Sequence, residues 1–146
     1  MHLSSSSDKE TQEYGVQLGK KLAKGLICLY GSLGAGKTTF VRGLAKGLGV
    51  KSRISSPTFT YQRVHKGRVK LYHFDCYRLE KPDQLLVQEL TEALVRNDGV
   101  VAVEWAEKII DFLPQQRLDI SLEYKTAECR KITYTSHDGS TSRTSH

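Results

Sequence analysis

Gly31-Ser32-Leu33-Gly34-Ala35-Gly36-Lys37-Thr38 matches the phosphate-binding loop pattern G-x-x-x-x-G-K-[ST] at every position. Glycines let the backbone curl so that successive N–H groups point at phosphate oxygens. The lysine can reach the β- and γ-phosphates of a nucleotide, and the threonine hydroxyl can coordinate Mg²⁺. An accidental match in a chain of ordinary composition and this length is roughly a one-in-two-hundred event. The stretch therefore predicts nucleotide binding through Gly34, Ala35, Gly36, Lys37, Thr38 and Thr39.

The residues on either side of the loop support this prediction. Residues 26–30 form a short apolar run that is typical of a buried parallel strand. After the loop, Phe40, Leu44 and Leu48 recur every four residues, which predicts a helix that Gly49 ends. A strand, a glycine-rich loop and a helix thus follow one another in the order that phosphate binding requires.

The rest of the chain reads as an α/β pattern. A helix is predicted from the S-x-x-E sequence at 7–10 to Gly25, and a polar segment at 49–56 precedes a β-hairpin at 58–74 that joins the sheet antiparallel. Pro82 suits the first turn of the next helix. These patterns predict a three-layer fold like that of P-loop NTPases, in which a mixed sheet has parallel core strands and an antiparallel hairpin. The remaining predicted elements are a helix through residues 86–94, a buried strand at 100–103, a short helix at 106–112 and strands at 118–124 and 130–135.

Composition places the chain among ordinary soluble globular proteins, because 38% of its residues are hydrophobic and 26% are charged. No apolar run approaches the ~18 residues of a membrane helix, and residues 1–7 lack the apolar stretch of a secretory signal. The three cysteines form no C-x-x-C pair, and their odd number argues against a disulfide framework. We therefore expect a cytoplasmic protein.

The net charge of +6 leaves two interpretations open. It fits a solvated basic surface, and it also fits a protein that works close to nucleic acid. Candidates for a basic patch are Lys51, Arg53, Arg63, Lys66, Arg68 and Lys70, without an accompanying RNA-binding motif.

Two acidic residues follow predicted strands and are candidates for the nucleotide site. A phosphate loop that holds Mg²⁺ usually has a carboxylate at the end of a neighbouring strand. Glu104 ends the buried run at 100–103 and is the first candidate, the alternative being a surface acid beside a core Trp105. Asp75 ends the hairpin and could bind metal-bound water or position the attacking water, unless it only pairs with Arg78.

Two further residues are ambiguous. Thr58 follows a proline in the polar segment, where it is either a switch-like threonine that senses the γ-phosphate or a strand-edge threonine. His73 lies on the same strand face as Asp75, and a hydrogen-bonded core histidine is favoured there over a catalytic one.

Four motifs in a fixed order give the chain a specific resemblance. They are G-S-L-G-A-G-K-T-T-F-x-R-G-L at 31–44, S-P-T-F at 56–59, H-F-D-C-Y-R-L at 73–79 and E-W at 104–105. With them the chain resembles the TsaE (YjeE) family of small bacterial ATPases, which are required for the threonylcarbamoyladenosine modification of tRNA. Ser32 and Cys76 differ from the residues usual in the family, but neither replaces a catalytic group.

The resemblance implies ATP and Mg²⁺ as cofactors and roles for individual residues. Lys37 would bind phosphate and Thr38 would bind Mg²⁺. The remaining implied positions are a switch threonine at Thr58, an acid linked to hydrolysis at Asp75, a metal-side carboxylate at Glu104, Trp105 against the nucleotide, and two further nucleotide contacts at Thr11 and Arg130.

It also implies partners and a domain plan. The expected partners are the threonylcarbamoyl transferase subunit (TsaD) and its scaffolding relative (TsaB), with tRNA contacted indirectly. ATP binding and hydrolysis would reset the transferase between turnovers. Residues 1–136 would form a single P-loop ATPase domain, followed by a disordered tail at 137–146 that is rich in Ser and Thr.

Three other functions share the phosphate loop. A small-molecule kinase needs a lid and a second substrate pocket, for which the predicted elements leave little length. A GTPase needs an [NT]-K-x-D motif, which the sequence lacks. A nucleotide-dependent interaction module would bind ATP with negligible turnover.

Overall fold

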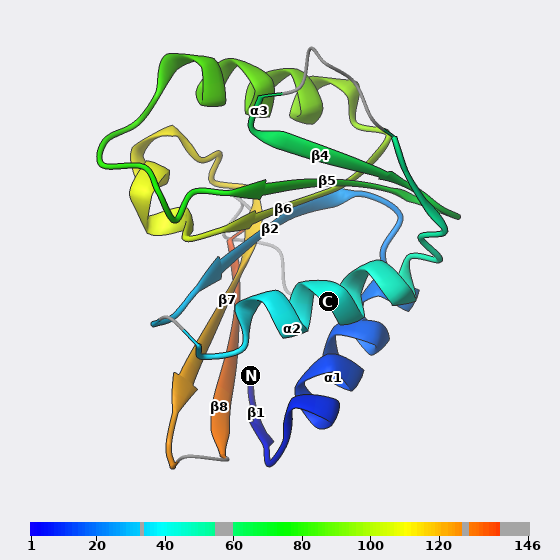
Figure 1. The fold of residues 1–146 in the computed structure, drawn as a ribbon, viewed down its shortest axis with the longest axis vertical. Helices are drawn as coiled ribbons and strands as arrows, with labels where there is room; N and C mark the ends of the chain where they lie inside the picture. Colours follow the sequence, from blue (N-terminus) through cyan, green and yellow to red (C-terminus); the bar gives the residue numbers. More distant parts are fainter. Residues whose placement is uncertain (33, 55–59, 127–128, 138–146) are drawn as a thin grey trace.

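The computed structural model describes residues 1–32, 34–54, 60–126 and 129–137, which form α-helices, a 3-10 helix and strands (Figure 1). No helix in these ranges is both long and apolar enough to cross a membrane. The helical elements are α1 (Asp8–Lys21), α2 (Lys37–Gly47), α3 (Gln84–Arg96) and the 3-10 helix η1 (Ala106–Phe112). The strands are β1 (His2–Ser5), β2 (Gly25–Tyr30), β3 (Ser52–Ile54), β4 (Gln62–Lys66), β5 (Lys70–Asp75), β6 (Gly99–Glu104), β7 (Arg117–Tyr124) and β8 (Arg130–His137).

The described strands form a single mixed sheet in the order β1-β8-β7-β2-β6-β5-β4-β3. β2 lies parallel to both β6 and β7, and β6 lies parallel to β5. The remaining pairs are antiparallel. This arrangement confirms the predicted mixed sheet with parallel strands at its centre. The carboxyl ends of β2, β5 and β6 meet at one edge, where the phosphate loop begins.

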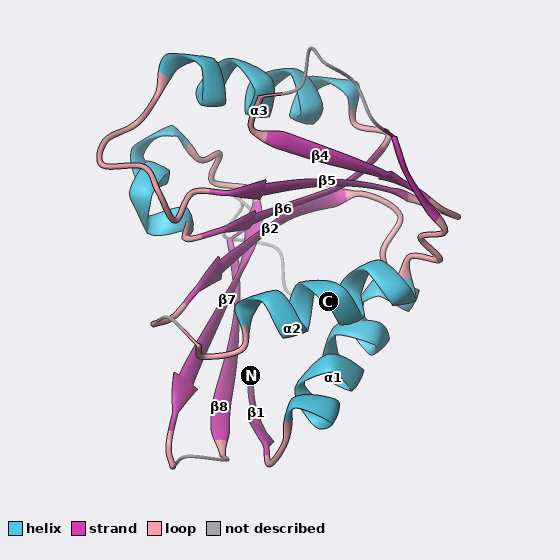
Figure 2. Cartoon of the chain, viewed as in Figure 1, coloured by secondary structure: helices cyan, strands magenta, loops and turns pink. Residues whose placement is uncertain are grey.

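Helices cover both faces of the sheet, which gives the predicted three layers (Figure 2). Side chains alternate along the central strands, so that Leu26 and Cys28 of β2 join the core beneath α3 and η1. Ile27 and Leu29 join the opposite core, beneath α1 and α2. The strands β2 and β6 are apolar along almost their whole length because both of their faces are buried.

Glycines set the contact between α1 and α2. An ideal Cβ at Gly43 would lie 2.0 Å from the Gln12 carbonyl oxygen, and one at Gly15 would lie 2.3 Å from the Phe40 carbonyl oxygen. Gly47 and Gly19 meet in the same way further along the two helices. The backbones therefore touch directly, and α1 is held tightly against the helix that follows the phosphate loop.

Three details differ from the sequence-based expectations. Within the polar segment at 49–56, for which no strand is predicted, β3 pairs with β4 at the edge of the sheet. The hairpin is antiparallel within itself, but β5 joins β6 in parallel because α3 carries the chain back to the same end of the sheet. Pro82 precedes α3, whose N-cap is Asp83. The tail predicted at 137–146 lies outside the described residues except for His137, which is the last residue of β8.

A buried carboxylate fastens the start of β4 to α3. Glu89 of α3 is 5% exposed and accepts hydrogen bonds from the backbone N–H groups of Thr60, Tyr61 and Gln62, at 2.9–3.0 Å. A carboxylate that accepts several N–H groups satisfies donors that would otherwise be buried without a partner.

Replacing Glu89 with Ala should therefore lower the free energy of unfolding by about 2–4 kcal/mol, since an unsatisfied buried donor costs about 1–3 kcal/mol. Chemical denaturation measures the loss. Glu92→Ala, at an exposed position of the same helix, is the control and should change stability by less than about 0.5 kcal/mol. Equal stability of the two variants would contradict the anchoring role.

Candidate functional site

The phosphate loop connects β2 to α2, as the sequence predicts. Gly34 and Gly36 have φ angles of 83° and 106°, in the left-handed region that favours glycine. A Cβ at Gly31 would lie 2.5 Å from the Leu122 carbonyl oxygen, so β7 leaves no room for a side chain there. The first turn of α2 places Lys37 and Thr38 at the carboxyl edge of the sheet.

Lys37 is buried and held beside the only tryptophan of the chain. Its Nζ donates to the Ser32 carbonyl oxygen at 3.0 Å and to the Gly31 carbonyl oxygen, and it lies 3.9 Å from the centroid of the Trp105 ring. Burial lowers the pKa of Lys37, although the acidic groups of Glu104, Glu107 and Asp75 act in the opposite direction. The Lys37 ammonium therefore lines the cavity as a cation that can bind phosphate.

Trp105 takes an unusual backbone conformation. Its φ of 58° and ψ of 43° lie in the left-handed region, which costs a residue with a Cβ about 1–2 kcal/mol. The bend directly after β6 brings its ring beside Lys37 and 5.1 Å from the ring of Tyr77. Backbone strain of this kind is concentrated at functional sites.

Glu104 ends β6 with a carboxylate that two side chains hold. Only 2% of the residue is exposed. Its Oε1 accepts a hydrogen bond from Thr38 Oγ1 at 3.0 Å, and its Oε2 lies 2.7 Å from His73 Nε2. Burial alone would raise the pKa of Glu104, but the hydrogen bonds from His73 and Thr38 and the charge of Lys37 outweigh it and lower that pKa. The residue is therefore an ionised, buried acid and not a surface acid.

Asp75 lies next to Glu104, because the two residues are register partners at the ends of β5 and β6. It is exposed, and its Oδ1 accepts a hydrogen bond from the Tyr77 backbone N–H at 3.0 Å. Among the described residues, the ion pair with Arg78 that we considered from the sequence is not formed. The other carboxylate oxygen of Asp75 has no hydrogen-bond partner within the part of the chain that the structure describes, and it lies beside the buried Glu104.

These groups surround one cavity of about 390 Å³. It brings together most of the predicted residues, while Thr11 and Ala35 are fully buried outside its lining and Thr58 falls outside the described residues. Thr11 Oγ1 lies 2.6 Å from Ser5 Oγ. The cavity is lined by Asp8, Gly34, Gly36, Lys37, Thr38, Thr39, Asp75, Tyr77, Glu104, Trp105, Tyr124 and Arg130.

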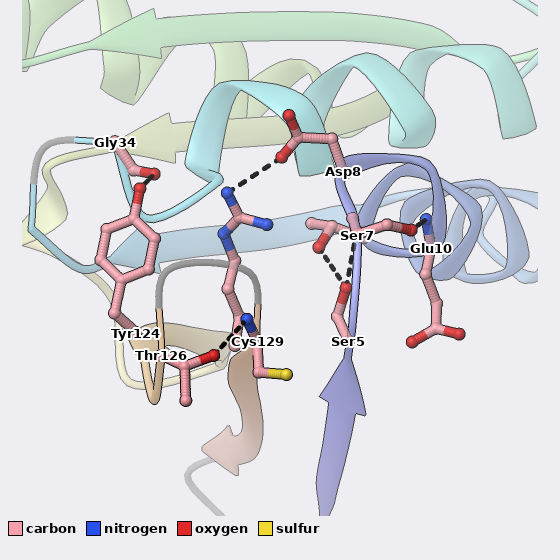
Figure 3. A network of polar contacts seen from close by, with 10 residues as sticks. Ser5, Ser7, Asp8, Glu10, Gly34, Tyr124, Thr126 and Cys129 are labelled. Atoms are coloured by element: carbon pink, nitrogen blue, oxygen red, sulfur yellow. Dashed lines mark hydrogen bonds and ion pairs between the residues drawn. The ribbon is translucent and has the colours of Figure 1, made fainter.

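One part of the cavity lining comes from β7, β8 and the start of α1 (Figure 3). The Tyr124 hydroxyl donates to the Gly34 carbonyl oxygen of the phosphate loop. The Arg130 guanidinium lies 5.2 Å from the Tyr124 ring and pairs with Asp8 at 2.9 Å. Arg130 is 9% exposed, and its Nε is buried without a hydrogen-bond partner. The Arg130 guanidinium therefore borders the cavity while it is paired with Asp8.

Three residues of the cavity lining, Asp8, Tyr77 and Tyr124, are not among the site residues predicted from the sequence. Asp8 lies in the S-x-x-E sequence, which predicts only the start of a helix. Tyr124 is the last residue of a strand in which apolar and polar residues alternate. Tyr124 is the register partner of Arg130, so the pairing of β7 with β8 carries both to the phosphate loop. No local pattern in the sequence reports such a long-range contact.

Comparisons with known proteins show the family of the chain. Residues 5–132 match the family described as threonylcarbamoyl adenosine biosynthesis protein TsaE. The tRNA threonylcarbamoyladenosine biosynthesis protein TsaE of Treponema pallidum is 40% identical to this chain, and the match covers 91% of this chain and 98% of the relative. The protein of the same name from Nostoc is 42% identical, and the match covers 88% of this chain and 82% of the relative. The crystal structure of YdiB from Bacillus subtilis superimposes with a TM-score of 0.76 at 32% identity, covering 95% of this chain and 86% of that one. The chain belongs to the TsaE family.

Proposed function

We propose that this protein is an ATPase that binds ATP with Mg²⁺ and serves the threonylcarbamoyladenosine modification of tRNA. The observation that carries the proposal is the meeting of Lys37, Thr38, Glu104 and Arg130 around one cavity at the start of α2. Family membership supports the place in tRNA modification, since the relatives are named for it.

The cavity suits a polyphosphate. The positive end of α2, the Lys37 ammonium and the Arg130 guanidinium all favour negative charge. Left-handed Gly34 and Gly36 leave space where a side chain would obstruct an approaching phosphate. Lys37 would exchange its bonds with the Gly31 and Ser32 carbonyl oxygens for charge-assisted bonds with phosphate, which are stronger.

The oxygen atoms at the other side of the cavity suit Mg²⁺. Thr38 Oγ1 and Glu104 Oε1 are 3.0 Å apart and are the hard oxygen ligands that this cation prefers. They would hold it directly or through water. A bound Mg²⁺ supplies charge neutralisation at the phosphate oxygens.

The surrounding residues have separate tasks in hydrolysis. Lys37 stabilises negative charge that develops on the phosphates. Asp75 lies beside Glu104 and has a carboxylate oxygen with which to orient a water molecule. Thr58 stays a predicted γ-phosphate sensor in a segment outside the described residues.

The proposed partners are the transferase subunit TsaD and its relative TsaB. Hydrolysis in this chain would reset the transferase between turnovers without moving the threonylcarbamoyl group itself. The test is co-purification with both subunits in ATP and in ADP, followed by an assay of tRNA modification. Modification that proceeds equally well without this chain would contradict the proposal. An acceptor alcohol phosphorylated faster than ATP is hydrolysed would instead favour a kinase.

Replacing Glu104 with Ala should lower Mg²⁺-dependent ATP hydrolysis by on the order of 10²-fold and weaken ATP binding much less. The reason is that Glu104 faces the proposed metal position, whereas the phosphates are held by the loop and Lys37. Phosphate release and calorimetry measure the two effects. Asp111→Ala removes an exposed acid of η1 that does not line the cavity, and it serves as the control. Normal hydrolysis by Glu104→Ala would show that the carboxylate has been assigned wrongly.

A further inference from the structure

His73 makes a contact that its place in the sequence does not explain. It lies on β5 opposite Ala102 of β6, two residues before the exposed Asp75. Its side chain is 11% exposed, and its Nε2 lies 2.7 Å from Glu104 Oε2. The phosphate loop thus contacts one oxygen of the Glu104 carboxylate through Thr38, and β5 contacts the other through His73.

We propose that His73 is a positioning residue, which holds Glu104 Oε2 so that Oε1 faces Thr38 and the metal position. The inference rests on the proposed function and adds to it a residue that does not itself touch nucleotide or metal.

The direction of this hydrogen bond follows from its partners. An ionised carboxylate only accepts hydrogen bonds, so His73 Nε2–H donates. Thr38 Oγ1 donates to Oε1, and a hydroxyl that donates to the acid still has lone pairs for a cation. With both oxygens engaged, the carboxylate has one orientation. Without His73, Oε2 would be buried with no side-chain donor, and the carboxylate could turn away from Thr38.

A pair of amide variants tests the donor itself. In His73→Gln the side-chain amide nitrogen reaches the position of Nε2, whereas in His73→Asn it reaches only as far as Nδ1. Both replacements are polar and uncharged, so they differ mainly in reach. His65→Gln is the matched control, since His65 is also a partly buried histidine on a strand. Its register partners are Arg53 on β3 and Leu71 on β5, and the Glu104 carboxylate is bonded to His73 and not to His65.

The measurement is ATP affinity as a function of Mg²⁺ concentration, followed by the fluorescence of Trp105. In His73→Asn, the Mg²⁺ concentration that gives half of the increase in ATP affinity should be about 10-fold higher than in the unmodified protein. Loss of a partner that orients a metal ligand typically costs 10–100-fold in metal affinity. His73→Gln and His65→Gln should stay within about 3-fold of the unmodified protein, a shift of about 0.7 kcal/mol or less. ATP affinity in EDTA should be the same in all four proteins, and thermal unfolding shows that each is folded.

Other outcomes overturn the inference in distinguishable ways. If His73→Asn keeps the normal Mg²⁺ dependence, His73 does not position the carboxylate. If both amide variants lose Mg²⁺ affinity equally, the imidazole acts through packing and not through its donor. If the unmodified protein binds no ATP at any Mg²⁺ concentration, the proposed function fails, and the inference fails with it.

Discussion

Lys37→Ala is expected to abolish ATP binding, with a loss of affinity of 100-fold or more. The Lys37 Nζ is a buried cation of the cavity, and it lies between two loop carbonyl oxygens and the Trp105 ring. Charged hydrogen bonds contribute about 1.5–3 kcal/mol each, and Lys37 can make more than one of them to phosphate. Arg130 and the helix end remain in the variant, but neither occupies the centre of the loop. Calorimetry with ATP and Mg²⁺ measures the loss.

Lys46→Ala is the matched control for this result. Lys46 lies on the same helix, is exposed and does not line the cavity. Its replacement also removes one positive charge, so it reports any general electrostatic effect of the net charge. Nearly equal ATP affinity of the two variants would contradict the assignment of the phosphate site. Absence of any heat of ATP binding to folded, unmodified protein would contradict nucleotide binding altogether.

Gly43→Ala is expected to destabilise the fold by about 3 kcal/mol or more, although Ala is the better helix former by about 1 kcal/mol. The added methyl group would lie 2.0 Å from the Gln12 carbonyl oxygen, which is backbone and cannot move aside alone. To relieve the overlap, α1 must separate from α2, and contacts along both helices are lost. Thermal and chemical denaturation measure the effect.

Arg42→Ala, one residue away and exposed, is the control for helix propensity. It should leave stability within about 0.5 kcal/mol of the unmodified protein. If Gly43→Ala were as stable as this control, the close contact between α1 and α2 would not exist in solution. A variant that is too unstable to purify while Arg42→Ala behaves normally would agree with the expectation.

The part of the site that the sequence predicts is the part with short-range signals. The phosphate loop is contiguous, so the strand, the loop, Lys37 and Thr38 could be placed from spacing alone. Glu104 could be placed because a fully apolar run of four residues precedes it and predicts a buried parallel strand. The structure brings Glu104 to within hydrogen-bond distance of Thr38, across 66 positions of sequence.

The remaining features depend on pairing between distant segments. β1 is a short stretch that contains two serines, and only its pairing with β8 makes it a strand. β3 is likewise defined by β4. The glycines of α1 and α2 look unfavourable for a helix when each is considered alone, and their purpose appears only when the two backbones meet.

The residues of the candidate site likewise divide into those that short-range patterns predict and those that depend on distant segments. The sequence favours a hydrogen-bonded histidine at position 73, and the structure shows its hydrogen bond, but the sequence could not name Glu104 as the partner. Asp8 and Tyr124 reach the cavity through the start of α1 and the β7–β8 pair, which no spacing rule predicts.

The ion pair between Arg130 and Asp8 has a consequence for how a nucleotide would enter. The Asp8 side chain is 72% exposed and occupies the same guanidinium that an incoming phosphate would approach. Association would then replace one anionic partner of Arg130 by another instead of satisfying an isolated positive charge. Added salt weakens the attraction of Arg130 to Asp8 and its attraction to phosphate alike. The ionic-strength dependence of ATP association should therefore be shallower than a count of the basic groups around the cavity suggests.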